Sequence, residues 1–372
     1  MGALRGVRIA DFSRVLAGPY ATMLLGDMGA HVIKIERPGV GDDTRSWGPP
    51  FDSLGRSTYF QSVNRNKEGV TADLSTDEGR AKAIAIIEES DVLVENFGAG
   101  GMEKFGLGYD RIKEEFPRLI YCSISGFGDS EEGKLLPGYD LLVQAMSGLM
   151  SITGPDSEHP TKVGVALIDV VTGLHSALGI TAAIVSRNET GHGQKIEINL
   201  LSSILSGMVN QTGAYTSAGV IPNSMGNAHP SITPYEAYKT KDKQIIIAVG
   251  NDGQFAKLCS VMGATFASDP KFSTNPSRVS NRAELNELMT SILITKSADE
   301  WVADFNKIGV PAGPINNIEQ AIHLAERLHL DPIVTISDSR DGTISRTIAN
   351  PIKFSETPNV YRYGPPSLGV DD

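Results

Sequence analysis

The start of the chain alternates between short apolar runs and one helical stretch, and this alternation limits the fold more than any other feature. Residues 7–10 and 31–35 are typical of strands, and residues 17–28 between them are typical of a helix. A strand, a helix and a strand connected in this order form a parallel βαβ unit. The sequence therefore predicts a parallel sheet from its first 35 residues.

The same alternation continues after this unit. Runs typical of strands occupy residues 70–74, 91–95 and 119–124, and helical patterns occupy residues 77–89, 112–116 and 139–150. We predict an α/β fold whose large domain has an open, doubly wound, Rossmann-like parallel sheet. Ligands of such sheets bind beyond the carboxyl ends of the strands, so we expect binding residues in the loops 11–19, 36–44, 96–101 and 126–138.

The length of 372 residues favours more than one domain. Residues 195–201 predict a strand and residues 202–215 a helix, and residues 216–234 are rich in Gly, Asn, Ser and Pro, which is typical of a linker. Beyond them we expect a strand at 245–249 and helices at 254–262, 281–293 and 298–308. The predicted parts are a large domain (1–215), a linker (216–234), a smaller α/β domain (235–330) and a C-terminal segment (331–372) that returns to the large domain.

Composition excludes several classes of function. The net charge of -11 argues against nucleic acid or an anionic membrane as the main partner. Cys122 and Cys259 are too few for a disulfide framework or a clustered metal site, and they suit a reducing compartment. We find no targeting segment and no apolar run of the length that spans a bilayer. These features predict a cytoplasmic protein with no metal and no membrane partner.

A nicotinamide-dependent oxidoreductase is the first alternative for a Rossmann-like chain. Such enzymes have a Gly-x-Gly-x-x-Gly turn after the first strand. Here residues 11–20 are DFSRVLAGPY, with a single glycine followed by proline. The sequence argues against a dinucleotide site at this turn.

One acid, Asp169, interrupts the apolar and small-residue stretch GVALIDVVTGLHSALGITAAI at residues 164–184. Residues 163–168 predict a short buried segment and residues 170–185 a helix, which places Asp169 at the N-cap or beside it. Two roles fit that place. A carboxylate there is most often a cap, which stabilises a helix by ~1 kcal/mol. A carboxylate kept ionised by a helix N-terminus, among small neighbours, is also suited to be a nucleophile.

Several blocks, taken together and in this order, resemble the class III CoA-transferases, the family of formyl-CoA:oxalate and carnitine CoA-transferases. They are RVLAGPYATMLLGDMGAHVIKIERPGVGDDTR, NRNK, ENFGAGGMEKFGLGYD, GYD at 138–140, GVALIDVVTGL, GNAHPSITPYEAYKTKD, VGNDGQF, GVPAGPINNI and NPIKFSETP. The GDDTRSWGPPF block and the pairing of SISGFG with GYD most resemble members of the succinate:hydroxymethylglutarate CoA-transferase type, which act on dicarboxylates.

The resemblance implies an aspartate nucleophile, which matches Asp169 and reverses the preference for a cap. It implies transfer of CoA from an acyl-CoA, such as succinyl-CoA, to a carboxylic and here dicarboxylic acid, through an aspartyl anhydride and an aspartyl-CoA thioester. Coenzyme A is then a substrate, and no tightly bound cofactor is expected. The resemblance also implies an interlocked homodimer.

Positions that match the CoA contacts of the family are Leu16, Ala17, Arg37, Ala72, Asp73, Leu74, Ser75, Asn96, Phe97, Gly98, Lys104, Leu136, Pro137, Gly138 and Tyr139. Arg37 and the nearby Lys67 offer positive charge for the phosphates. Leu16 and Lys104 depart from formyl-CoA transferase, which has Gln and Arg at these positions. The segment 224–231, SMGNAHPS, stands in place of its glycine-rich flap. Candidate contacts for the acid are Arg14, Arg45, Asn227 and His229.

An α-methylacyl-CoA racemase is the alternative within the same fold. It moves a proton at the carbon next to the thioester, which requires an acid and a base. The racemase relatives carry a histidine where this chain has Tyr139, and a tyrosine with an ordinary pKa of ~10 is poorly suited to that task. The sequence therefore favours the transferase.

Overall fold

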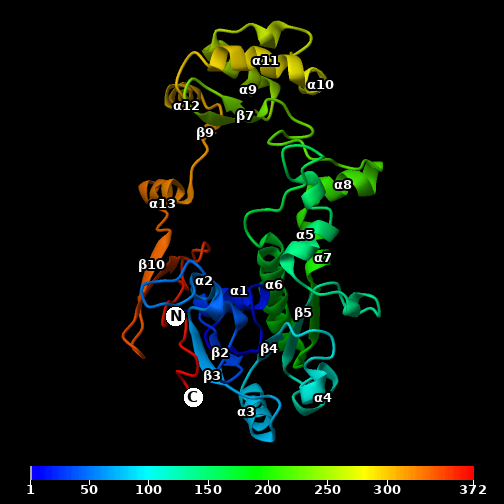
Figure 1. Ribbon diagram of the computed structural model, residues 1–372, viewed down its shortest axis with the longest axis vertical. Helices are drawn as coiled ribbons and strands as arrows, with labels where there is room; N and C mark the ends of the chain where they lie inside the picture. Colours follow the sequence, from blue (N-terminus) through cyan, green and yellow to red (C-terminus); the bar gives the residue numbers. More distant parts are fainter. Residues whose placement is uncertain (1) are drawn as a thin grey trace. The chain divides into compact units, whose positions relative to one another are not determined.

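The computed structural model describes residues 2–372, which form two compact units (Figure 1). The first unit comprises residues 2–150, 162–221 and 331–372, and the second comprises residues 151–161 and 222–330. Each unit has a sheet and a buried hydrophobic cluster of its own.

The first unit is built on a six-stranded sheet with the order β3-β2-β1-β4-β5-β6. All neighbouring strands are parallel. The strands are β1 (Arg8–Asp11), β2 (His31–Glu36), β3 (Lys67–Thr71), β4 (Val92–Glu95), β5 (Ile120–Ser125) and β6 (Lys195–Asn199). This order is that of a doubly wound Rossmann-like sheet, so the predicted parallel α/β fold is confirmed.

Helices cover both faces of this sheet. On one face, Ile87 of α3 and Ile112 of α4 pack with Tyr121 of β5 in a buried cluster. The next strand residue, Cys122, points to the opposite face, where it meets Ser176 of α6. The helices of this unit are α1 (Ala17–Asp27), α2 (Thr58–Val63), α3 (Asp77–Glu88), α4 (Tyr109–Glu115), α5 (Asp140–Met146), α6 (Leu167–Thr190), α7 (Leu200–Gly207) and α8 (Val209–Ala218).

Two predicted elements of this unit have different bounds in the structure. Strand β3 begins at Lys67 rather than at residue 70. Lys67 is buried in an ion pair, and a charged residue is not expected from the sequence at the start of a buried strand. The predicted helix 202–215 is two helices, α7 and α8, divided at Met208 and Val209. Val209 has a φ of 34°, a left-handed value that interrupts a regular helix.

The C-terminal residues 331–372 belong to the first unit. They begin with the antiparallel hairpin of β10 (Ile333–Ser337) and β11 (Ile344–Ile348). The chain then runs to the edge strand β3, where Gly69 N donates to Asp371 and Thr71 N donates to Asp372. These carboxylates satisfy backbone amides that an edge strand would otherwise leave open.

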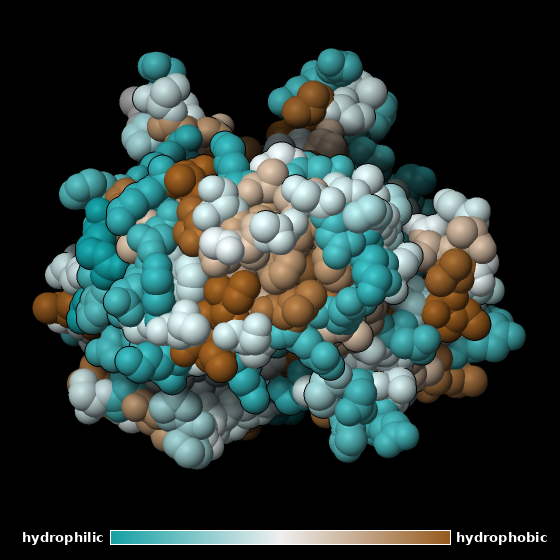
Figure 2. Space-filling view, turned by 90° about the horizontal axis from the view of Figure 1, so that it is seen from above, coloured by the Kyte–Doolittle hydropathy of each residue, from teal (hydrophilic) through white to brown (hydrophobic). Residues whose placement is uncertain are grey.

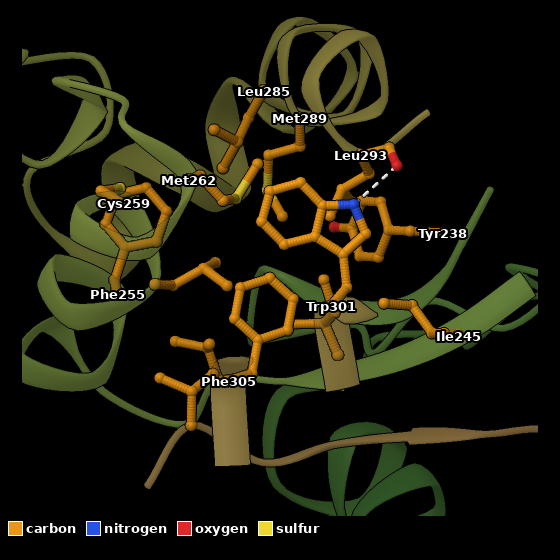
Figure 3. Close-up of a cluster of buried hydrophobic side chains, with 14 of the residues drawn as sticks. Tyr238, Ile245, Phe255, Cys259, Met262, Leu285, Met289, Leu293, Trp301 and Phe305 are labelled. Carbon is orange, nitrogen blue, oxygen red and sulfur yellow. Dashed lines mark hydrogen bonds between the residues drawn. The ribbon is translucent and has the colours of Figure 1, made fainter. Parts of the chain in front are cut away.

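The second unit has an antiparallel sheet with the order β7-β8-β9. Its strands are β7 (Tyr235–Lys239), β8 (Gln244–Ala248) and β9 (Ala312–Pro314), and its helices are α9 (Asp252–Met262), α10 (Asn275–Ser280), α11 (Arg282–Leu293), α12 (Ala298–Lys307) and α13 (Ile318–Arg327). Trp301 is the largest side chain of the core in Figure 3; it stacks on Phe305 at 5.3 Å, and its indole N–H donates to Leu293 O at 2.7 Å. The indole is thus buried without losing its hydrogen bond.

Apolar residues also reach the surface of both units. Ile294 and Ile315 of the second unit are exposed, and Figure 2 shows hydrophobic residues gathered near the middle of one face within a largely hydrophilic rim.

In the first unit, α6 alone among residues 2–372 is long and apolar enough, by length and composition, to cross a membrane, with a mean hydropathy of 1.6. The helix packs against α1, β5 and β6, as a core helix does.

Candidate active site

A cleft of about 1050 Å³ opens within the first unit. Its walls include the segments that follow three strands: Val15 after β1, Phe97 after β4 and Phe127 after β5. The cleft therefore lies beyond the carboxyl ends of parallel strands, where doubly wound sheets bind their ligands.

Eleven of the residues that the sequence singled out lie together in this cleft, and one of them is Arg14, a candidate contact for the acid. The other ten are Leu16, Ala17, Asn96, Phe97, Gly98, Leu136, Pro137, Gly138, Tyr139 and Asp169. The other candidates in the first unit do not line it: Arg37, Arg45, Ala72, Asp73, Leu74, Ser75 and Lys104. Arg37 follows β2, and the segment that starts at Ala72 follows β3, so both lie at the same edge of the sheet as the cleft. Asn227 and His229 belong to the second unit.

Asp169 lies in the first turn of α6, one wall of the cleft. The helix begins at Leu167 with Ala166 as its N-cap, so Asp169 is the third helical residue and makes no capping hydrogen bond. The first interpretation of Asp169 as a helix cap, which the family resemblance reversed, is therefore wrong. The preceding residues also differ from the prediction of a buried segment, because Gly164 and Val165 are exposed.

The cap is supplied by another acid, Asp140, at the start of α5. Its Oδ1 accepts hydrogen bonds from the backbone N–H of Ile168 at 2.9 Å and of Asp169 at 3.4 Å. Gln144 donates to the other oxygen of Asp140 and accepts from Val163 N at 2.9 Å. Because Asp140 accepts the hydrogen bonds of these two amides, the carboxylate of Asp169 is not needed as the cap. The sequence offered only the GYD motif as a signal for Asp140.

The surroundings of Asp169 make its carboxylate unusually basic. Burial and, after it, the negative charge of Asp140 raise the pKa of Asp169 to about 7. Among residues 2–372, no side chain or backbone N–H donates a hydrogen bond to its carboxylate oxygens. A carboxylate that is hard to ionise and has no fixed partner is a better nucleophile once it is ionised.

The charges of Asp169 and Asp140 also affect the pKa of the Tyr59 hydroxyl on α2. Burial and then the charges of Asp169 and Asp140 raise its pKa to about 12. Tyr59 packs edge-to-face on Trp47 at 5.2 Å, and the two rings line a second, smaller recess of about 240 Å³. An aromatic recess therefore lies within electrostatic range of Asp169.

Glycines allow the close contacts that shape the cleft. A Cβ atom at Gly173, one turn after Asp169, would lie 2.7 Å from Ala17 O, so glycine lets α6 approach the start of α1. A Cβ atom at Gly138 would lie 2.8 Å from the Cα atom of Gly126, so the loop that carries Tyr139 touches the loop after β5. Both contacts depend on the missing side chain.

Sequence reasoning missed several ionisable groups of the cleft, and Glu95 is one whose pKa is clearly raised. Glu95, the last residue of β4, lines the cleft and is buried. Burial raises its pKa to about 7, although hydrogen bonds from Ser123 and from Phe97 N oppose the shift. A glutamate at the end of an apolar strand was the only signal in the sequence.

The positive charges of the cleft come from Arg14, Lys134 and Lys195. The Arg14 guanidinium lies 5.1 Å from the centre of the Phe97 ring and 3.7 Å from Asp43. Lys195 pairs with Glu197 and, at 3.4 Å, with Asp129. These cations are the groups of the cleft that an anionic ligand can contact.

Lys67 does not belong to the site. Its side chain is fully buried, and its ammonium donates to Asp11 at 3.0 Å, Pro19 O at 2.9 Å and Asn64 at 2.9 Å. Burial, opposed by the charge of Asp11, lowers its pKa to about 8. The expectation that Lys67 meets phosphates is therefore wrong, because all three of its donors are occupied inside the protein.

Arg45 and His229 already have partners inside their own units. Arg45 donates to Glu36 at 2.9 and 2.5 Å and to Pro366 O at 3.0 Å, and its guanidinium lies 3.9 Å from the Phe60 ring centre. The Nδ1 atom of His229 accepts from Ser231 N at 3.1 Å, and its ring meets Tyr235 edge-to-face. These contacts fix the loops that carry the two residues.

A Rossmann-like unit with a carboxylate nucleophile candidate in its ligand cleft is the arrangement of a group-transfer enzyme. The profile of CoA-transferase family III matches residues 4–372 of the chain. The chain belongs to this family.

Named relatives extend the same comparison. A succinate–glutarate CoA-transferase of Agrobacterium fabrum is 40% identical and covers 98% of this chain and 93% of its own. A succinyl-CoA:mesaconate CoA-transferase of Haloarcula hispanica is 41% identical and covers 96% and 91%. Among solved structures, a CAIB/BAIF family protein of Brucella suis is 40% identical, with a TM-score of 0.87 over 99% of this chain and 97% of its own.

Proposed function

We propose that this enzyme moves CoA from succinyl-CoA or a related acyl-CoA to a dicarboxylic acid, with Asp169 as the nucleophile. The observation that carries the proposal is the basic, unpartnered carboxylate of Asp169 in the wall of the cleft. The two relatives are named for succinate with glutarate and for succinyl-CoA with mesaconate, which are all dicarboxylic acids. These names support the choice of substrates.

The proposed reaction starts with attack of the ionised Asp169 on the thioester carbonyl carbon. The carbon–sulfur bond breaks, so the products are a mixed aspartyl anhydride and CoA thiolate. The thiolate then attacks the aspartyl carbonyl carbon and releases the first acid as its carboxylate, which leaves an aspartyl-CoA thioester. The acceptor carboxylate attacks this thioester, and the freed thiolate attacks the new acyl group, so a new acyl-CoA forms and Asp169 is regenerated.

The backbone around Asp169 suits the charges that develop in these steps. The amides of Ala17 and Gly18 open α1, and the first amides of a helix have no acceptor within the helix. Negative charge on a thioester oxygen is favoured near such a helix start. Gly173 brings α6 against Ala17, and both Ala17 and Asp169 line the cleft.

We place the pantetheine arm of CoA in the cleft, along residues 16–17, 96–98 and 136–139. The nucleotide end would extend along the sheet edge to Arg37, Lys104 and residues 72–75. Arg37 and Lys104 are exposed, so both cations are open to phosphates. For the acid we keep Arg14 and the smaller aromatic recess in the first unit, with Arg45, Asn227 and His229 as further candidates.

The enzyme is proposed to act as an interlocked homodimer. In a single chain, α6 leaves Leu174, Leu178 and Val185 at 47, 68 and 58% exposure. An apolar stripe of this kind on the helix that carries Asp169 is expected to be covered by a partner, and a second copy fits the family. Light scattering on the wild type and on Leu178→Glu tests it: a dimer that the substitution weakens supports the proposal, and a wild-type monomer contradicts it.

Mass spectrometry after incubation with succinyl-CoA tests the nucleophile. Hydroxylamine or borohydride should modify the wild type at a peptide that contains Asp169, and Asp169→Ala should remain unmodified. A panel of dicarboxylic acids then identifies the acceptor by the acyl-CoA formed. If no acyl-CoA labels Asp169 while deuterium from solvent enters the α-carbon of a branched acyl-CoA, the protein is a racemase and the proposal is wrong.

A further inference from the structure

The segment from Arg14 to Ala17 lines the cleft and contains a strained residue. Val15 has a φ of 68°, in the left-handed region. A β-branched side chain rarely adopts this conformation, because it brings the side chain too close to the backbone. Surrounding contacts must therefore hold the segment in place.

A fully buried ion pair behind the cleft wall supplies these contacts. The carboxylate of Asp42 accepts the backbone N–H of Val15, with distances of 3.2 and 3.3 Å to its two oxygens. The ammonium of Lys34 donates to Asp42 at 3.0 Å and to Ser13 O at 2.9 Å. Neither side chain is exposed. The pair thus holds one N–H and one carbonyl on either side of Arg14.

Asp42 is itself held firmly. Its Oδ1 accepts from Thr44 N at 3.0 Å and from the Thr44 hydroxyl at 2.8 Å, and its own N–H donates to Glu36 at 2.8 Å. Although burial opposes it, the charge of Lys34 and the bonds from Thr44 keep the pKa of Asp42 below its usual value. The carboxylate therefore stays charged and oriented near neutral pH.

On the side that faces the cleft, the segment is held by Asn96, which also lines the cleft. Asn96 accepts the N–H of Arg14 at 2.8 Å and donates to Arg14 O at 2.7 Å. Asn96 thereby fixes Arg14, while Lys34 and Asp42 fix the residues beside it from the buried side. The strain at Val15 is maintained from both sides.

Resting on the proposed function, we propose that Lys34 and Asp42 are positioning residues for CoA transfer. They touch no substrate. They hold the segment 13–17 so that Leu16, Ala17 and the first amides of α1 face the thioester that Asp169 attacks. If the pair is disrupted, Val15 relaxes to a negative φ and this wall shifts. A shift of about 1 Å in a reacting group can cost on the order of a hundredfold in rate.

The central experiment is a rescue. Asp42→Asn should lower kcat by about 30-fold or more, with a much smaller change in KM, because the cleft remains but its wall is misplaced. Val15→Gly added to Asp42→Asn should recover about tenfold of that loss, because glycine adopts a φ of 68° without strain. A role limited to stability would not respond to the residue at position 15.

Asp27→Asn is the matched control, because Asp27 forms an equally buried ion pair with Arg65 and does not line the cleft. It should lower the unfolding midpoint and leave kcat within about threefold of the wild type. Equal losses of kcat in Asp27→Asn and Asp42→Asn, or no recovery from Val15→Gly, would overturn the inference.

Two further measurements keep the test decisive. If Asp42→Asn does not fold, Thr44→Val removes only one hydrogen bond to Asp42, and it should lower kcat less but in a way that Val15→Gly still restores. Labelling of Asp169 by succinyl-CoA separates this inference from the proposed function. If the wild type is not labelled, the proposed function fails; if the wild type and Asp42→Asn are labelled at the same rate, the positioning role fails.

Discussion

Two aspartates of the first unit show how differently one side chain is used. Asp27, the last residue of α1, is fully buried, and its carboxylate accepts four hydrogen bonds: from Arg65 at 3.0 and 2.7 Å, from Asn66 at 2.7 Å and from Asn350 at 3.2 Å. Asp169, near the start of α6, is only partly buried and accepts none from residues 2–372. The first carboxylate is fixed and the second is available.

The difference shows how the fold separates stability from chemistry. A buried carboxylate with a full set of donors holds neighbouring segments together, and removal of its charge leaves the donors unpaired. A carboxylate without donors, beside a second acid, costs stability when it ionises. Groups with pKa values shifted in this way are concentrated at functional sites.

The largest expected effect comes from Asp169→Asn. Removal of the proposed nucleophile should lower kcat for CoA transfer by at least ~1000-fold, because the proposed covalent intermediates could not form. A coupled assay with succinyl-CoA and a dicarboxylic acid measures it. Activity within tenfold of the wild type would contradict the role of Asp169.

The same variant should be more stable than the wild type above neutral pH. The raised pKa means that, between about pH 4 and 7, the unfolded chain binds fewer protons at this site than the folded chain, so the wild type loses unfolding free energy as the pH rises. Asp169→Asn lacks this loss and should gain ~1–3 kcal/mol at pH 8. Urea unfolding at pH 4.5 and 8 measures it, and an equal difference at both values would contradict it.

Asp27→Asn should have the opposite effect on stability. The substitution leaves the buried guanidinium of Arg65 without its counter-charge, which should cost ~3 kcal/mol. Urea unfolding measures this loss. If Asp27→Asn were as stable as the wild type, the prediction that Asp27 stabilises the fold while Asp169 does not would be wrong.

A smaller effect is expected at the glycine that brings α6 to α1. Gly173→Ala places a Cβ atom 2.7 Å from Ala17 O, so the helices must separate, at a cost of ~1–3 kcal/mol and with a lower kcat as Asp169 moves. Gly213→Ala in α8 is the control, because its Cβ atom would meet nothing within 4 Å. Thermal unfolding and the transfer assay should distinguish the two variants.

The finest effect is expected from Asp140→Asn. It removes the charge that, after burial, raises the pKa of Asp169, and it keeps an oxygen that can cap α6. The acid limb of kcat/KM, expected near pH 7 in the wild type, should move to lower pH. A pH profile with an unmoved acid limb would show that Asp140 does not act on Asp169 through its charge.

Much of the fold could be predicted because its signals are local. The apolar runs around residues 9, 33 and 93 became β1, β2 and β4 within one or two residues. The predictions failed where a tertiary partner outweighed local character. Lys67 resembles a surface residue until Asp11 is placed beside it, and residues 202–215 show no break until Val209 takes its left-handed φ.

Only part of the candidate site could be predicted from the sequence, for the same reason. Motif resemblance led to Asp169 and to the cleft residues after β1 and β4, but not to the roles of the groups behind them. Asp140 caps α6 from 28 residues upstream, and Asp42 reaches Val15 across 27 residues. Local patterns contain no information on such contacts.

The sequence by itself determined the parallel α/β fold and the family, and it singled out Asp169 as a candidate, because alternating hydrophobicity and ordered motifs are properties of the chain. The tertiary structure alone decided which acid caps α6, which lysines are buried and how strongly Asp169 holds its proton. The physical reason is that burial, hydrogen bonding and charge act across space. They depend on neighbours that only the folded chain brings together.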